Sequence, residues 1–137
     1  MNIHVFSMVF SIAVIILHSS CSSTSVKNAR FLYGSDEATV IVPITCSSIE
    51  YNLVEVKRKD VKNKAFLNAL ETEMGKLQPY EKDGLPRDVD VRIKLVVDYK
   101  DDASDTLCLG GFYGTILNGN LMEDNPQLLD LIKSKIY

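Results

Sequence analysis

Histidine is the side chain most often used for acid–base catalysis near neutral pH, and this chain has only two, His4 and His18. Both lie in an apolar N-terminal stretch, residues 1–20, which we predict to be removed as an export signal. The mature chain would then contain no histidine. A serine or cysteine nucleophile activated by histidine, and a histidine-ligated zinc, are excluded on this prediction. Catalysis would have to use carboxylates, lysine or tyrosine.

Four aspartates surround a turn that we predict near residues 100–105. They are Asp98, Asp101, Asp102 and Asp105. Oxygen-rich loops bind calcium, but this spacing does not match the twelve-residue loop with its central glycine and terminal glutamate. Aspartate is also a residue that exposed turns favour. We therefore expect a solvated turn and no metal site, and this cluster is only a weak calcium candidate.

Paired carboxylates are the other chemistry that the sequence offers. A glycan-cleaving enzyme places two acids on either side of the scissile bond. Asp88 with Asp90, or Asp98 with Asp101, are the candidate pairs. The same aspartates, beside Arg92 and Lys94, suit surface ion pairs equally well. We expect a protein that is not an enzyme, and an enzyme acting on cell-envelope glycans is the alternative.

Three cysteines remain as reactive side chains: Cys21, Cys46 and Cys108. Cys46 follows Ile44 and Thr45, and Cys108 lies between two leucines, so both have apolar neighbours typical of strands. In an oxidising compartment two such thiols can form a disulfide. Two inert buried thiols are the alternative.

The N-terminal stretch gives the clearest indication of where in the cell the protein is located. All 15 basic and 18 acidic residues follow it, beginning at Lys27. Its apolar run, Ile3 to Leu17, reaches roughly 22 Å as a helix, which is shorter than the ~30 Å hydrocarbon core of a bilayer. A short apolar run followed by small residues is typical of an export signal.

The residues after this run are Leu17-His18-Ser19-Ser20-Cys21. This segment resembles the lipobox of bacterial lipoprotein precursors, although Leu17 lies one position further from the cysteine than in that family. The resemblance implies cleavage before Cys21, acylation of its thiol and attachment to the bacterial cell envelope. Ser22 after the cysteine implies the outer membrane, with the domain facing the periplasm. A conventionally secreted protein and an uncleaved membrane anchor are the alternatives.

Two further motifs are weighed for partners and cofactors. A run of basic residues comprises Lys57, Arg58, Lys59, Lys62 and Lys64. The net charge of −3 and the lack of interleaved aromatic residues disfavour nucleic acid as a partner. Gly110, Gly111 and Gly114 are spaced like a phosphate-binding loop, but no helix start follows them. We expect no cofactor.

Hydrophobic periodicity predicts the elements that hold these residues. Residues 21–29 are polar and predict a flexible tether. We expect strands over 39–45 and 49–56, then a helix capped by Asp60 with an apolar face at Phe66, Leu70, Met74 and Leu77.

The second half of the chain gives the stronger pattern. Strict alternation over 89–99 predicts a long antiparallel strand, with 106–109 as its hairpin partner. Gly110 and Gly111 predict a bulge, and a further strand is expected over 112–117. Asn118-Gly119 predicts a tight turn, and Asn125 followed by Pro126 predicts the start of a closing helix.

These elements give the order β-β-α-β-β-β-α in a single α+β domain over residues 30–137. The expected architecture is a small antiparallel sheet with two helices packed on one face. With its predicted signal and without histidine or cofactor motifs, the chain is expected to bind a protein or a ligand in the envelope. Its role would be that of an accessory subunit or an inhibitor or immunity-type protein.

Overall fold

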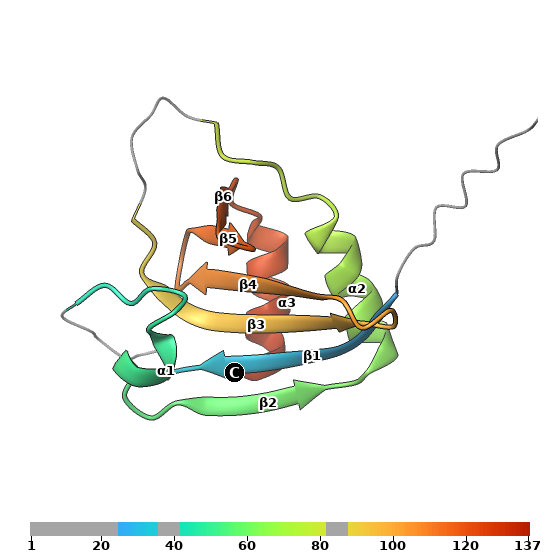
Figure 1. Cartoon of the computed structure of the whole chain (residues 1–137), viewed down its shortest axis with the longest axis horizontal. Helices are drawn as coiled ribbons and strands as arrows, with labels where there is room; N and C mark the ends of the chain where they lie inside the picture. The colour runs from blue at the N-terminus through green and yellow to red at the C-terminus, as the bar shows by residue number, and fades with distance from the viewer. Residues whose placement is uncertain (1–24, 36–41, 82–87) are drawn as a thin grey trace, which may run out of the picture.

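The computed structural model describes residues 25–35, 42–81 and 88–137, which form a six-stranded antiparallel sheet with three helices (Figure 1). The strand order across the sheet is β2-β1-β3-β4-β5-β6. In chain order the elements are β1 (Val26–Tyr33), α1 (Ile49–Asn52), β2 (Lys57–Val61), α2 (Lys64–Met74), β3 (Val91–Tyr99), β4 (Ser104–Gly110), β5 (Thr115–Leu117), β6 (Asn120–Met122) and α3 (Pro126–Ile136). The predicted α+β class is confirmed.

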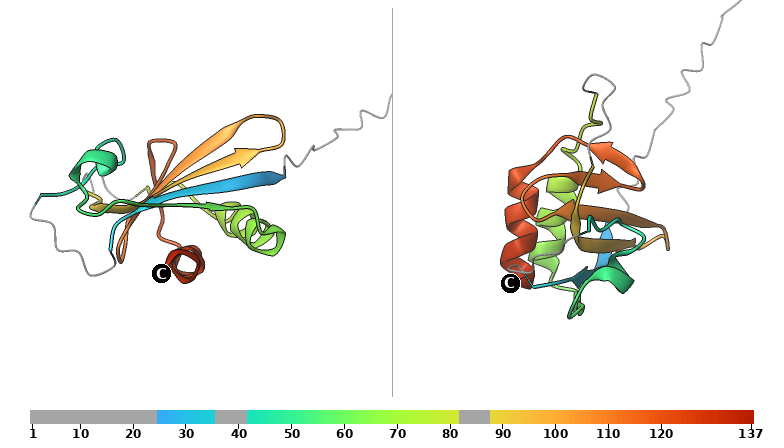
Figure 2. Two further views of the ribbon diagram at one scale, coloured as in Figure 1. Left: turned by 90° about the horizontal axis from the view of Figure 1, so that it is seen from below. Right: turned by 90° about the vertical axis from the view of Figure 1, so that its left-hand side faces the viewer.

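The main core lies between the sheet and the two long helices. Figure 2 shows α2 and α3 side by side on one face of the sheet. Alternate residues of β3, including Leu95 and Val97, point to this side and are fully buried. They meet Leu70 of α2 and Ile132 of α3, which are also fully buried. The alternation in the sequence therefore marks the face that the helices cover.

Among the described residues, those that cover the opposite face of the sheet lie at one end of it. Residues 42–56, which include α1, pack there against a second apolar cluster. That cluster includes Leu32 of β1, Val91 of β3 and Cys108 of β4, together with Ile44 and Ile49 from the covering segment. Beyond this segment the face is polar, as the alternation over 89–99 predicts.

Three sequence predictions in the second half are confirmed in detail. The strand predicted over 89–99 is β3, and it pairs with β4 as an antiparallel hairpin. Asn118 and Gly119 both have positive φ, 50° and 83°, in the turn between β5 and β6. The side chain of Asn125 caps α3 by accepting a hydrogen bond from the Leu128 N–H at 3.1 Å.

The predicted tether is wrong from Val26 onward, because β1 begins there and lies between β2 and β3. A register shift between Val26 and Asn28 puts both Val26 and Ala29 in buried positions. This irregularity breaks the alternation of polar and apolar residues that marks a strand. Only residues 22–25 separate Cys21 from the sheet.

The predictions for residues 39–56 are also wrong where the structure describes them. Residues 42–45 are not in a strand, and residues 39–41 lie outside the described part of the chain. Ile49–Asn52 is the helix α1, and the strand is instead Lys57–Val61, which contains the first three residues of the basic run. Because β2 is an edge strand with only Val61 buried, it carries no apolar alternation.

The starts of α2 and β5 also differ from those predicted. The cap of α2 is Asn63, not Asp60, and its Oδ1 accepts from the Phe66 N–H at 2.9 Å. Asp60 lies within β2. The strand expected over 112–117 is β5 and covers only Thr115–Leu117. The residues before it form a glycine-containing turn that projects from the sheet.

Candidate binding site

A tight turn joins β4 to β5 and holds two aromatic side chains outward. The Gly110 N–H donates to the Gly114 carbonyl at 2.9 Å, and the Gly114 N–H donates to Asp124 Oδ1 at 2.7 Å. Gly114 has φ +92°, and a Cβ atom on Gly110 would collide with the Tyr113 carbonyl oxygen. The turn thus requires glycine at both positions. It leaves Phe112 88% and Tyr113 57% exposed.

The bulge predicted at Gly110 and Gly111 lies on the partner strand instead, where Arg92 is the extra residue, and residues 111–113 form a bend. The pairing of β3 with β4 shifts register between Val91 and Ile93, opposite Leu109 and Gly110. This shift ends the regular hairpin just before the turn. The side chains that follow are thereby placed beyond the end of the sheet.

Tyr137 adds a third aromatic ring at the same end. Its hydroxyl donates to the Gly34 carbonyl at 3.1 Å, just past the end of β1. Its ring meets that of Tyr33 edge-on, with 5.6 Å between centroids. Although both contacts hold the ring in place, 49% of Tyr137 is exposed. We call the group of Phe112, Tyr113 and Tyr137 the aromatic end.

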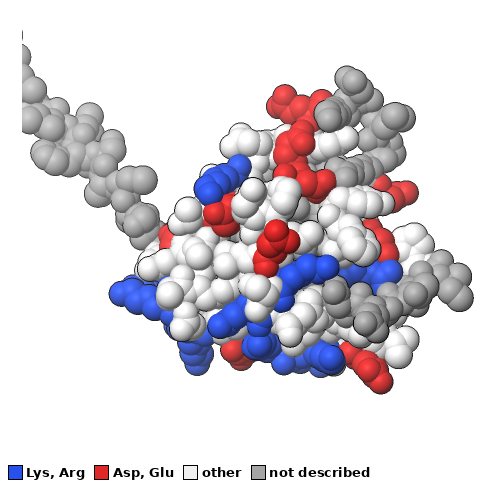
Figure 3. Space-filling model, turned by 180° about the vertical axis from the view of Figure 1, so that it is seen from behind, with Lys and Arg blue, Asp and Glu red and all other residues white. Residues whose placement is uncertain are grey.

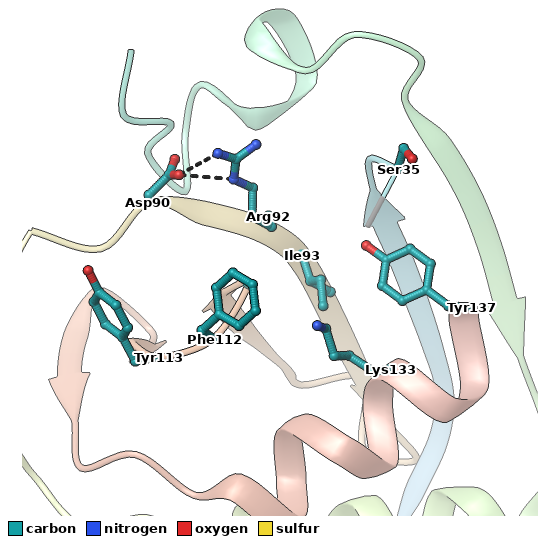
Figure 4. Close-up of a pocket in the computed structure, with 9 residues that line it drawn as sticks. Ser35, Asp90, Arg92, Ile93, Phe112, Tyr113, Lys133 and Tyr137 are labelled. Atoms are coloured by element: carbon teal, nitrogen blue, oxygen red, sulfur yellow. Dashed lines mark hydrogen bonds and ion pairs between the residues drawn. The ribbon is translucent and has the colours of Figure 1, made fainter. Parts of the chain in front are cut away.

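Charged side chains lie beside these rings (Figure 4). Arg92 Nε and Nη2 donate to Asp90 Oδ2 at 3.0 and 2.6 Å. The other carboxylate oxygen of Asp90 accepts from the Ile44 N–H at 3.0 Å. Lys133 Nζ lies 5.3 Å from the centroid of the Phe112 ring, within the range of a cation–π contact.

These side chains line a cavity of about 160 Å³. Figure 4 shows Arg92 and Ile93 on one side of it, with Phe112, Lys133 and Tyr137 around them. Pockets that enclose drug-sized ligands are about 300–1,000 Å³. This cavity therefore has room for a side chain or a small terminal group. It is too small for a large organic cofactor.

The two cysteines of the folded domain are joined. Cys46, just before α1, forms a disulfide with the fully buried Cys108 of β4, with 5.7 Å between their Cα atoms. The bond fastens residues 42–56 to the sheet face opposite α2 and α3. Cys21, the predicted acylation site, lies outside the described residues.

The four aspartates of the weak calcium candidate do not converge. Within residues 25–35, 42–81 and 88–137, no group of three or more His, Cys, Asp or Glu side chains is placed to hold a metal ion. Asp98 pairs with Arg30, and Asp101 accepts from the Ala103 N–H at 3.2 Å. Asp102 lies 3.9 Å from Lys27 Nζ. Each of these carboxylates has a different partner.

Asp105 has a role in the hairpin. It accepts from the Tyr99 hydroxyl at 2.6 Å and from Asn118 Nδ2 at 2.8 Å. Burial of the phenol, together with this carboxylate, raises the pKa of Tyr99 well above its ordinary value. The contact stabilises the turn between β3 and β4 and links it to the turn after β5.

The two candidate acid pairs are at opposite ends of β3. Asp88 and Asp90 lie at its start, while Asp98 and Asp101 lie at its end. Asp90 forms an ion pair with Arg92, and Asp98 forms one with Arg30. Surface ion pairs were the alternative to a catalytic role for these aspartates. Asp88 is exposed.

The basic run follows the edge of the sheet. Lys57, Arg58 and Lys59 lie in the edge strand β2, and Lys59 Nζ donates to the Lys135 carbonyl at 2.6 Å. Figure 3 shows Lys and Arg side chains gathered toward the lower part of the helix-covered face. Charged side chains on an edge strand discourage pairing with another sheet.

Comparison with protein-family models, curated proteins and solved structures gives no match. Of the helices in the described ranges, none combines the length and apolar character needed to cross a bilayer.

The sequence does not predict the aromatic end as a group. Its rings come from the β4–β5 turn and from the last residue of the chain, so only the fold brings them together. The one local signal is the pair Phe112-Tyr113 between glycines. Glycines on both sides of adjacent aromatic residues indicate a tight turn that exposes the rings.

Proposed function

We propose that this protein is a lipid-anchored binding protein of the bacterial envelope that engages a partner protein through its aromatic end. The main support is the distribution of exposed large apolar side chains. In the described part of the chain these are Val42, Tyr51, Val54, Phe112, Tyr113 and Tyr137. They belong to residues 42–56, to the β4–β5 turn and to the C-terminus. Exposed aromatic residues held in fixed positions are typical anchors of protein interfaces.

All of these segments lie at one end of the sheet. Residues 42–56 follow the end of β1 and precede the start of β2, and the β4–β5 turn follows the end of β4 (Figure 1). Tyr137 contacts Gly34, just after β1. The partner surface would therefore be local and continuous with the cavity.

The proposed anchor is at the other end of the sheet. The Ser25 carbonyl accepts from the Lys100 N–H at 3.2 Å, which ties the start of β1 to the β3–β4 turn. Residues 22–25 span at most about 14 Å when extended. Acyl chains on Cys21 would hold this end toward the membrane. β1 is eight residues long, so the aromatic end would lie roughly 26 Å further out.

The disulfide supports the exported location. Disulfides persist in oxidising compartments such as the periplasm and are rare in the reducing cytosol. The Cys46–Cys108 bond lies in the folded part of the chain, where it attaches the apolar segment 42–56. The bond that favours an exported location thus also holds residues 42–56 in place, and these residues carry three of the exposed apolar side chains.

The anchor is tested by labelling with palmitate in a bacterial host. Wild-type protein is expected to incorporate label and to fractionate with membranes, and Cys21→Ser to do neither. Unlabelled wild-type protein would overturn the lipid anchor.

The partner surface is tested by cross-linking the processed protein in envelope extracts and recovering the adducts. The double variant Phe112→Ser/Tyr113→Ser should lose at least nine-tenths of a specific adduct. The control Lys100→Ser/Asp101→Ser changes the opposite end and should retain it. Equal recovery with both double variants would exclude the aromatic end as the partner surface.

A further inference from the structure

We infer that the cavity of the aromatic end recognises a partner segment that presents a carboxylate beside an apolar side chain. This inference rests on the proposed function and names the chemistry that the same site selects. The observations that carry it are the charges lining the cavity and the position of one lysine.

The carboxylate that lines the cavity is already bonded within the domain. Asp90 accepts two hydrogen bonds from Arg92 on one oxygen and one from the Ile44 N–H on the other. Its charge is thus offset by Arg92, whose side chain is only 18% exposed. Lys133 adds a second cation among the described lining residues. Both cations carry several N–H donors, so a carboxylate entering the cavity would find donors on its walls.

Two lysines of α3 show how the site differs from an ordinary surface contact. Lys133 Nζ lies 5.3 Å from the centroid of Phe112, and Lys135 Nζ lies 5.4 Å from that of Phe66. Phe66 is 8% exposed and belongs to the core, whereas Phe112 is 88% exposed. Of these two lysines, Lys133 is therefore the one that lies beside an aromatic ring that a partner can reach.

That combination defines the partner. An apolar side chain would pack on the exposed rings of Phe112 and Tyr137, removing apolar surface from water. A carboxylate beside it would accept a charge-assisted hydrogen bond from Lys133 Nζ. The cavity of about 160 Å³ has room for one such side chain. An acidic residue next to an aromatic or aliphatic residue meets both requirements.

The turn that carries Phe112 and the ring of Tyr137 are held in place before binding. The Gly110–Gly114 hydrogen bond fixes the turn that carries Phe112, and the bond to Gly34 fixes Tyr137. Side chains that are already ordered lose little entropy when a partner binds. The aromatic end is therefore suited to binding a short segment of a partner protein.

The test is selection of a random peptide library on the processed protein, purified from an exporting host so that the disulfide forms. We expect selected peptides to place Asp or Glu next to an aromatic or aliphatic residue. Their affinity for Lys133→Glu should fall at least tenfold. Lys135→Glu is the matched control, since it changes the same charge on the same helix beside the buried ring, and affinity should stay within about twofold.

Two outcomes would overturn the inference alone. One is a set of peptides that bind through Phe112 but carry no acidic residue, which would leave the proposed partner surface intact. The other is a set of acidic peptides that bind Lys133→Glu as well as wild type. If no selected peptide depended on Phe112 or Tyr113, the proposed partner surface would fail as well. Circular dichroism of each variant checks that a lost affinity does not reflect unfolding.

Discussion

Arg30 and Asp98 join β1 to β3 across the sheet face that α2 and α3 leave uncovered. Arg30 Nε donates to Asp98 Oδ2 at 2.8 Å, and Nη2 donates to Oδ1 at 2.9 Å. This two-point contact is the geometry in which guanidinium and carboxylate groups fit best. The hydrogen bond and charge of Arg30 lower the pKa of Asp98 below its ordinary value.

The Arg30–Asp98 pair predicts a loss of stability in acid. Because the folded-state pKa of Asp98 is lowered, its contribution is complete above the unfolded pKa of about 3.9 and is lost as pH falls through the folded value. Water screens the half-exposed Arg30, so Asp98→Asn should cost about 1 kcal/mol at pH 7. Urea unfolding at pH 7 and pH 3 measures this, and the difference from wild type should shrink at pH 3.

Asp130→Asn is the control for that measurement, since it removes one carboxylate from an exposed position on α3. Its free energy of unfolding should match wild type within about 0.5 kcal/mol at pH 7. An equal effect of the two substitutions would show that net charge, and not the pair, determines the result.

The disulfide predicts a large effect of reduction. The bond connects cysteines separated by 62 positions in sequence. Closing a loop of that size restricts the unfolded chain and stabilises the fold by about 4 kcal/mol. We expect Cys46→Ala/Cys108→Ala to lower the free energy of unfolding by about 2–4 kcal/mol. Mass spectrometry should show a gain of about two daltons when the wild-type domain is reduced, since each thiol takes up one hydrogen.

The reductant should leave the unfolding of the double alanine variant unchanged. If wild type unfolded at the same urea concentration with and without reductant, while its mass rose on reduction, the bond would not stabilise the domain.

Substitution of Gly114 should destabilise the fold by an amount that depends on the residues packed around it. An alanine there would keep φ at +92° and place its Cβ 2.6 Å from Val89 Cγ1. Gly119 also has positive φ, +83°, but nothing lies within 4 Å of the position of a Cβ. Gly119→Ala should therefore cost about 1 kcal/mol from backbone strain alone, and Gly114→Ala about 2–4 kcal/mol. Thermal unfolding of the two variants compares these costs, and equal Tm values would mean that Val89 moves aside freely.

The N-cap of α2 gives a prediction that distinguishes Asn63 from Asp60 as the capping residue. The side chain of Asn63 accepts from the Phe66 N–H, whereas Asp60 is part of β2. Asn63→Ala should cost about 1 kcal/mol. Asp60→Asn should change the free energy of unfolding by less than about 0.5 kcal/mol. A larger loss for Asp60→Asn in urea unfolding would favour the cap expected from sequence.

How well the sequence predicted each strand depended on where that strand lies. β3 is covered on one face along its length, so its residues alternate and the pattern is visible. β2 is an edge strand with four exposed residues, and the bulge near Asn28 disturbs the burial pattern of β1. Neither strand has a period that sequence analysis could detect.

The short helix α1 depends on local polar contacts. Ser48 Oγ accepts from the Thr45 N–H at 3.0 Å, and the Ser48 N–H donates to the Thr45 carbonyl at 3.1 Å. The apolar and β-branched residues nearby favoured strands instead. Ile49, fully buried in the second cluster, anchors α1 through a tertiary contact that the sequence does not reveal.

The candidate site was harder to predict from the sequence than the strands were. The sequence left open whether Cys46 and Cys108 form a disulfide or stay as two buried thiols, and the structure has the disulfide. The sequence also left the aspartates near Arg92 and Lys94 as either ion pairs or candidate acids, and the structure shows Asp90 paired with Arg92. The cavity itself requires Phe112, Lys133 and Tyr137 to converge from β4–β5 and α3, which depends on how the helix crosses the sheet.

The position of β1 between β2 and β3 has a consequence for how the protein reaches its folded state. The first strand in sequence pairs with β2 on one edge and with β3 on the other. During synthesis β1 emerges well before β3, so the sheet can form only after most of the chain has been made. Deleting residues 26–33 would also separate β2 from the rest of the sheet, because no other strand lies between β2 and β3.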